Sequence, residues 1–79
     1  MDYDQDKVDE AVLALLYLTM FENHGITRAW KNHDWDALDR LHQKGGIHDT
    51  KSKAKSVVVT EAGRIRAKEL FEKFFSKLP

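Results

Sequence analysis

The absence of cysteine from a chain of only 79 residues is the feature that most limits how this protein can fold. A domain of this size buries only ~60% of the surface that its unfolded chain exposes, and small secreted domains often add disulfides to compensate. Without thiols, every helix and strand has to share one apolar core. The sequence therefore predicts a single domain over residues 1–79, in a reducing compartment such as the cytoplasm.

The longest apolar stretch covers residues 11–21 and is interrupted only by Thr19. It is shorter than the roughly 20 residues that a membrane-spanning helix needs. Acidic residues precede it, whereas a secretory signal carries positive charge at that place. We therefore expect a cytoplasmic protein with no membrane partner.

Three segments have the capping residues and the apolar spacing of α-helices. Asp6 is expected to cap the first, over residues 6–22. Asp34 caps the second, over residues 34–44, which ends before Gly45. Thr60 caps the third, over residues 60–76, in which apolar residues recur at three- and four-residue spacing.

The segment between the first two long helices is expected to begin with a left-handed helix stop at residues 23–25. Ile26 would then form one rung of a strand, and Thr27 would cap a short helix that carries Ala29 and Trp30. This short helix and the helix over residues 34–44, joined by a tight turn, would make a helix-turn-helix.

A β-hairpin is predicted after Gly45 and Gly46. Ile47 lies at the start of one arm, and the largely β-branched run over residues 56–59 forms the other arm. The tip of the hairpin is basic and carries Lys51, Lys53 and Lys55. The predicted class is therefore α+β and mostly helical, with three helices, a β-hairpin wing and a long C-terminal helix.

This order of elements resembles a winged helix-turn-helix, and particular residues carry the resemblance. Residues 41–47 (LHQKGGI) followed by residues 57–63 (VVVTEAG) are similar to the end of the recognition helix, the wing and the start of the last helix in MarR- and PadR-type bacterial regulators. The resemblance covers about residues 27–66 and implies DNA binding and dimerisation through terminal helices. Those families usually have a large aliphatic residue where this chain has Gly46, which predicts a looser root of the wing. The whole chain also resembles a family of short bacterial proteins of unknown function.

Charge is divided unequally along the chain although the net charge is zero. Residues 1–39 contain nine acidic and three basic residues, and residues 40–79 contain four acidic and ten basic residues. A basic half can contact nucleic acid or an acidic protein surface, including the acidic half of a second copy.

Two functions remain open, and the first is binding of double-stranded DNA. Arg40 and Gln43 are residue types that read guanine and adenine edges, and lysines would hold the phosphate backbone. The candidate DNA contacts are Arg40, Gln43, Lys44, Lys51, Lys53, Lys55 and Arg64. Asp36 and Asp39 on the same helix as Arg40 oppose this hypothesis, because phosphates would repel them.

The second function is a non-enzymatic protein-interaction or dimerisation module. The first helix is apolar nearly all round and the last is rich in phenylalanine, which leaves more apolar surface than one small core can cover. The candidate interface residues are Leu13, Tyr17, Met20, Phe71 and Phe75. Trp30 and Trp35 are expected to fill the core beside the helix-turn-helix rather than to stack on bases.

Catalytic chemistry is not expected from these residues. The four histidines and the carboxylates lack the spacing of a metal-ligand pair. No serine lies in a predicted strand-to-helix elbow, and no glycine-rich phosphate loop occurs. We therefore expect no enzyme activity, no metal or other cofactor and no small-molecule substrate.

Overall fold

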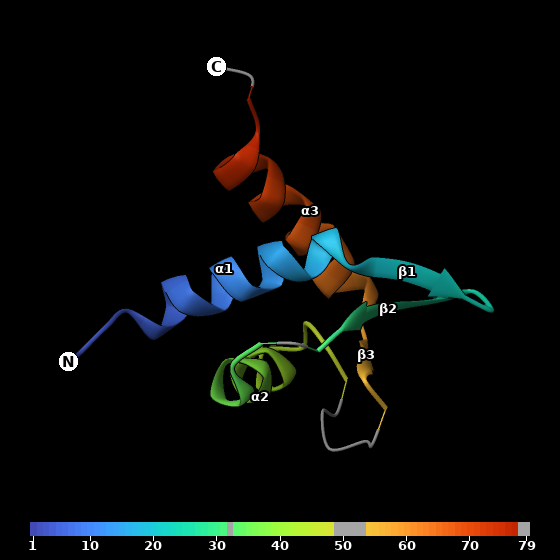
Figure 1. Cartoon of the computed structure of the whole chain (residues 1–79), viewed down its shortest axis with the longest axis horizontal. Helices are drawn as coiled ribbons and strands as arrows, with labels where there is room; N and C mark the ends of the chain where they lie inside the picture. The colour runs from blue at the N-terminus through green and yellow to red at the C-terminus, as the bar shows by residue number, and fades with distance from the viewer. Residues whose placement is uncertain (32, 49–53, 78–79) are drawn as a thin grey trace.

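The computed structural model describes residues 1–31, 33–48 and 54–77. The elements in chain order are α1 (Gln5–Leu18), β1 (Met20–Asn23), β2 (Ile26–Trp30), α2 (Trp35–Gln43), β3 (Ser56–Val58) and α3 (Glu61–Phe75). The strands form a three-stranded antiparallel sheet in the order β1-β2-β3. α1 lies between α3 on one side and α2 on the other, and the sheet continues from its C-terminal end (Figure 1). The fold class is a small α+β domain.

The helix caps explain where the helices begin. The side chain of Asp34 accepts a 3.1 Å hydrogen bond from the Ala37 N–H, and the Thr60 hydroxyl accepts one of 2.9 Å from the Gly63 N–H. The predictions for α2 and α3 are therefore confirmed to within one residue at each end. α1 begins before the predicted position, because Asp4 rather than Asp6 is its N-cap and accepts from the N–H of Lys7 at 3.1 Å.

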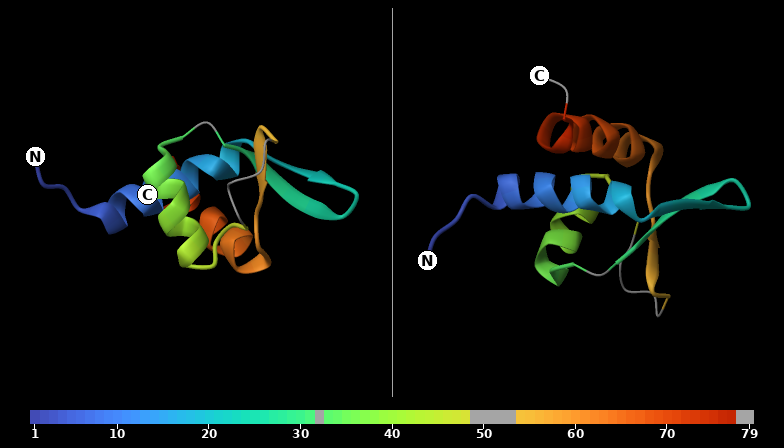
Figure 2. Two further views of the ribbon diagram at one scale, coloured as in Figure 1. Left: turned by 90° about the horizontal axis from the view of Figure 1, so that it is seen from below. Right: turned by 45° about the horizontal axis from the view of Figure 1, so that its top comes forward.

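The predicted short helix at residue 27 is wrong, because the segment from Met20 to Trp30 forms a β-hairpin. α1 ends at Leu18, four residues before the predicted end at residue 22. His24 and Gly25 have φ angles of +54° and +79°. A two-residue hairpin turn of type I′ needs positive φ at both positions. Figure 2 shows this hairpin projecting beyond the helices. No helix-turn-helix is formed in this part of the chain, since β2 pairs with both β1 and β3.

The predicted pairing of Ile47 with the β-branched run is confirmed. Ile47 forms an antiparallel bridge with Val59, and the His48 N–H donates to the Val58 carbonyl at 2.9 Å. The predicted hairpin tip, with Lys51 and Lys53, lies outside the described residues.

The predicted loosening at Gly46 stays a prediction, and the structure shows close backbone contact at this junction. A Cβ atom on Gly63 would overlap the carbonyl oxygen of Gly46 and lie 2.7 Å from its carbonyl carbon, so the two backbones are in direct contact. The Thr60 N–H donates to the Gly46 carbonyl at 3.1 Å, and its hydroxyl lies 2.6 Å from the Gly45 carbonyl oxygen. The absence of a side chain at Gly63 therefore lets the start of α3 pack tightly on the end of α2.

The core lies where the three helices and the inner side of the sheet meet. Ala14 of α1 and Ala67 of α3 are completely buried, and small residues let two helices approach closely. The buried apolar residues are Val12, Leu13, Ala14, Leu16, Ala29, Ala37, Leu38, Leu41, Ile47, Val57, Val59, Ala67 and Leu70. α2 is thus fixed to α1 on one side, and its opposite side is left at the surface.

Candidate nucleic-acid interface

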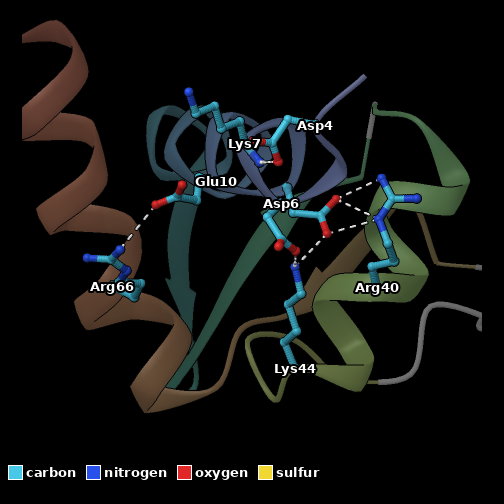
Figure 3. Close-up of polar contacts among 8 residues, drawn as sticks. Asp4, Asp6, Lys7, Glu10, Arg40, Lys44 and Arg66 are labelled. Carbon is cyan, nitrogen blue, oxygen red and sulfur yellow. Dashed lines mark hydrogen bonds and ion pairs between the residues drawn. The ribbon is translucent and has the colours of Figure 1, made fainter. Parts of the chain in front are cut away.

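The two cations of α2 that were expected to face DNA are directed at α1 instead (Figure 3). Arg40 Nε lies 2.9 Å from both carboxylate oxygens of Asp9, and its Nη2 lies 2.8 Å from Oδ1. Lys44 Nζ lies 2.8 Å from Asp9 Oδ2 and 2.9 Å from Asp6 Oδ1. The side chain of Asp9 is only 2% exposed. The charged cluster of Asp6, Asp9, Arg40 and Lys44 is therefore part of the α1–α2 contact.

The protonation of this cluster follows from its contacts. Burial raises the pKa of the Asp9 carboxyl, but hydrogen bonds from Arg40 and Lys44 outweigh it and hold the pKa below its usual value. The same hydrogen bonds raise the pKa of Lys44. All three groups are therefore charged at neutral pH, and the guanidinium of Arg40 is not directed outward as base reading would require.

The remaining candidate DNA contacts that the structure describes lie on or beside three different elements. Gln43 is exposed on α2, where Asp36 and Asp39 are exposed too. Arg64 is exposed in the first half of α3, and Lys55 is exposed immediately before β3. The outer side of α2 therefore presents carboxylates beside Gln43, and the exposed candidates Lys55 and Arg64 belong to the β3 and α3 part of the chain.

The candidate interface residues are mostly part of the interior. Leu13 is 5% exposed and belongs to the core, so its assignment to a surface interface is wrong. The ring of Tyr17 packs on Phe71, with centroids 5.3 Å apart, and Met20 is partly buried against the core. The reason is that α3 covers the side of α1 that the sequence left without a partner. Phe75 alone of the five is largely exposed, at 49%.

The prediction that both tryptophans fill the core is wrong. Trp30 is 49% exposed and Trp35 is 71% exposed. Trp30 lies at the end of a strand rather than in a helix, so its side chain projects from one face of the sheet. Its ring packs on Phe21, with centroids 5.3 Å apart and an angle of 35° between the planes.

The strand register defines the face that holds this aromatic pair. Phe21 pairs with Arg28, Arg28 with Val58, and Trp30 with Ser56. Side chains of paired residues lie on the same face, and alternate residues share it. We call this the outer sheet face, and it consists of Phe21, Asn23, Ile26, Arg28, Trp30, Ser56 and Val58. The other face carries Ala29 and Val57, which are buried in the core.

Positive charge accompanies the aromatic pair on the outer sheet face. Arg28 Nε donates to the Ser56 hydroxyl at 2.8 Å, and Nη2 donates to the Ser56 carbonyl at 3.1 Å, which fixes the guanidinium against the sheet. The Lys31 N–H donates to the Lys55 carbonyl at 3.0 Å, so these lysines follow and precede the paired residues Trp30 and Ser56. None of the residues that form this face is acidic.

Sequence reasoning missed this face although a signal was present. Ile26, Arg28 and Trp30 alternate with Thr27 and Ala29, which is the spacing of side chains on one face of a strand. The interpretation of residues 23–25 as a helix stop places the residues that follow in a helix instead of a strand. An alternating pattern after a possible type I′ turn was the signal for the hairpin.

Comparison with known proteins defines the family but no activity. Residues 4–77 match the family described as "Domain of unknown function (DUF6429)". The chain belongs to this family. The DUF6429 chain is also 48% identical to "Uncharacterized protein y4hR" of Sinorhizobium fredii (strain NBRC 101917 / NGR234), over 98% of this chain and the whole of that protein. No solved structure matches.

In the part of the DUF6429 chain that the structure describes, no helix is both long enough and apolar enough to cross a bilayer. Within the same residues, no three histidine or carboxylate side chains gather in an arrangement that could hold a metal ion.

Proposed function

We propose that this protein is a non-catalytic nucleic-acid-binding domain whose outer sheet face stacks on the unpaired bases of a single strand. The observation that carries the proposal is the Phe21–Trp30 pair, with Trp30 half exposed beside the fixed guanidinium of Arg28. Aromatic side chains on an open sheet are a common platform for unpaired bases. Each stacked base contributes about 1–3 kcal/mol, largely independent of sequence.

The charges around the aromatic pair support contact with phosphates. Arg28 has its orientation fixed by Ser56, and Lys55 is exposed at the same edge of the sheet. The absence of carboxylates from the outer sheet face removes the repulsion that a phosphate backbone would meet elsewhere. Lys51 and Lys53 precede Lys55 in the sequence and extend the basic segment.

Reading of duplex DNA by α2 has weaker support. Asp36 and Asp39 are exposed on this helix, and Arg40 is bonded to Asp9. The part of the winged-helix resemblance that covers the wing agrees with binding near β3, because Ile47 pairs with Val59 as expected. The helix-turn-helix part gives no support, since the residues of its first helix form β2.

Fluorescence of Trp30 tests the proposal directly. In a Trp35→Phe variant, Trp30 is the single tryptophan. We expect an oligothymidine of about twelve nucleotides, within the usual range of site sizes, to quench its emission. A duplex of the same length is expected to bind more weakly, because its bases are already stacked on one another. Lack of any quenching at low salt would contradict the proposal.

A pair of tryptophan variants separates stacking from non-specific attraction. Trp30→Ala is expected to weaken binding of the oligothymidine by roughly 5- to 150-fold, which corresponds to the stacking of one base. Trp35→Ala is the matched control, because Trp35 is also exposed but lies on α2. We expect the control to bind like the unchanged protein in a fluorescence anisotropy titration. Duplex binding that survives Trp30→Ala but is lost in Lys55→Glu would favour the wing instead.

A further inference from the structure

A second exposed apolar surface lies along α1 and the C-terminal half of α3. On α1, the residues Lys7, Ala11, Leu15 and Leu18 recur at the spacing of one helix face. Two of them, Leu15 and Leu18, are 36% and 64% exposed. On α3, Phe74 and Phe75 are 41% and 49% exposed. We call these apolar residues, with Ala11, the α1–α3 face.

The two helices form one continuous surface. Between the two helices lies a cleft of about 530 Å³, which is lined by Lys7, Glu10, Ala11, Lys73, Phe74 and Phe75. Ala11 therefore connects the exposed leucines of α1 to the phenylalanines of α3. Toward its C-terminus, α3 rises away from α1, as Figure 1 shows. The residues of the chain that the structure describes leave this face open to solvent.

The two ends of α1 carry charges of opposite sign. Asp2 and Asp4 are exposed just before its N-terminal end. Beyond its C-terminal end, Arg64 and Lys68 line a groove of about 340 Å³ together with Tyr17, Met20, Phe21, Glu22 and Thr27. Neither Arg64 nor Lys68 forms an ion pair within residues 1–31, 33–48 and 54–77. The N-terminal segment and the β1–β2 hairpin lie at opposite ends of the molecule (Figure 2).

We infer that a second copy of this chain covers the α1–α3 face, with the two α1 helices antiparallel about a two-fold axis. This arrangement places the leucine stripe of one copy on that of the other and removes both from water. It also places Asp2 and Asp4 of each copy opposite Arg64 and Lys68 of the other, so that unlike charges meet twice. A partner of one charge sign would match only one end of this face. The inference does not depend on nucleic-acid binding, because Trp30 and Arg28 take no part in it; Phe21 is the one described residue that borders both surfaces.

Sedimentation equilibrium of the full chain, from micromolar to several hundred micromolar protein, tests the apolar part of the interface. We expect a monomer–dimer equilibrium that Leu18→Glu weakens by roughly tenfold or more, since a buried charge without a partner opposes association. Ile65→Glu is the matched control. Ile65 is 49% exposed on α3 but lines neither the cleft nor the groove, so the control should dimerise normally. Both substituted side chains are exposed, and circular dichroism should confirm unchanged helix content.

Charge exchange tests the antiparallel arrangement. Lys68→Glu and Asp2→Lys should each weaken self-association, because like charges then meet at both ends of the interface. A mixture of the two variants should form heterodimers at least as well as the unchanged protein dimerises, since one end retains the original pair and the other has the reversed pair. A strict monomer throughout the concentration range, or an equal effect of Ile65→Glu, would overturn the proposed interface. Failure of the mixture to restore association would overturn the antiparallel arrangement.

Discussion

The α1–α2 contact and the outer sheet face each contain an arginine and large apolar residues, but they differ in the partner of the arginine and in the exposure of the apolar residues. In the contact, Arg40 is bonded to a carboxylate that is 2% exposed, and the apolar residues of α2 are buried. On the sheet, Arg28 is bonded to the neutral Ser56, and Trp30 is half exposed. Of these two arginines, Arg28 is therefore the one whose charge is not already paired with a carboxylate in these contacts. The location of Asp9 on α1 directs the guanidinium of Arg40 toward α1 and away from the outer side of α2.

With the proposed function, this comparison leads us to expect that the helix contacts contribute stability and that the outer sheet face contributes to binding. Substitutions in the helix contacts should lower the free energy of unfolding. Substitutions on the exposed face should change the affinity for a ligand and leave unfolding largely unchanged, because most surface changes are within about 0.5 kcal/mol. The following variants test the first half of this statement.

Gly63→Ala is expected to have the largest effect on stability. Its new Cβ atom would overlap the Gly46 carbonyl, and backbone cannot move aside as a flexible side chain can. We expect the free energy of unfolding to fall by about 3 kcal/mol or more, at the upper end for overpacked sites. The measurement is urea denaturation followed by circular dichroism.

Gly46→Ala is the matched control at the same junction. A Cβ atom on Gly46 would lie 3.5 Å from the Leu41 carbonyl oxygen and 4.0 Å from the Gly63 Cα, which are ordinary contacts. We therefore expect a much smaller change than for Gly63→Ala. Equal destabilisation by the two substitutions would mean that the close approach of these backbones does not determine the packing of α3.

The success of the sequence predictions depended on how local the deciding interaction is. Asp34 and Thr60 cap helices through an N–H three residues away, so their own neighbours identify them. By contrast, residues 23–25 suit either a helix end or a type I′ turn, and the pairing of Arg28 with Val58 decides between the two. That partner lies thirty positions further along the chain, so the local alternation of residues 26–30 indicates a strand but not the second strand with which it pairs.

The candidate site was also difficult to predict where the deciding contact joins residues that are distant in the sequence. The contact between Asp9 and Arg40 joins residues 31 positions apart, and spacing within α2 does not reveal it. The exposure of Trp30 depends on which face of β2 meets the core, and this is settled by Ala29 and Val57 on the opposite face. The sequence therefore identified candidate residues by their type, but it did not predict the direction in which their side chains point.

Asp9→Asn is expected to have an intermediate effect. The substitution keeps the shape of the side chain but removes the charge that Arg40 and Lys44 contact. We expect a loss of about 2 kcal/mol in the free energy of unfolding, as for charge-assisted hydrogen bonds of a buried group. Asp6→Asn is the control, because Asp6 contacts the same Lys44 but its side chain is 85% exposed. A loss in the control as large as in Asp9→Asn would show that burial of Asp9 is not what makes its charge important.

Acid should reduce the difference between the unchanged protein and Asp9→Asn. The Asp9 pKa is lowered in the folded state, because hydrogen bonds from Arg40 and Lys44 outweigh the effect of burial. A carboxyl with a lowered folded pKa contributes its full stabilisation above the pKa of the unfolded chain, about 4, and loses it as the pH falls through the folded value. Burial also lowers the pKa of His33, but this histidine is present in both proteins and cancels from the difference. Urea denaturation at a series of pH values measures the difference in free energy of unfolding between the unchanged protein and Asp9→Asn. We expect this difference to be constant above about pH 5 and to become smaller at lower pH. A difference that grows in acid would have the wrong sign for an ionised Asp9 and would contradict its role in holding α2 on α1.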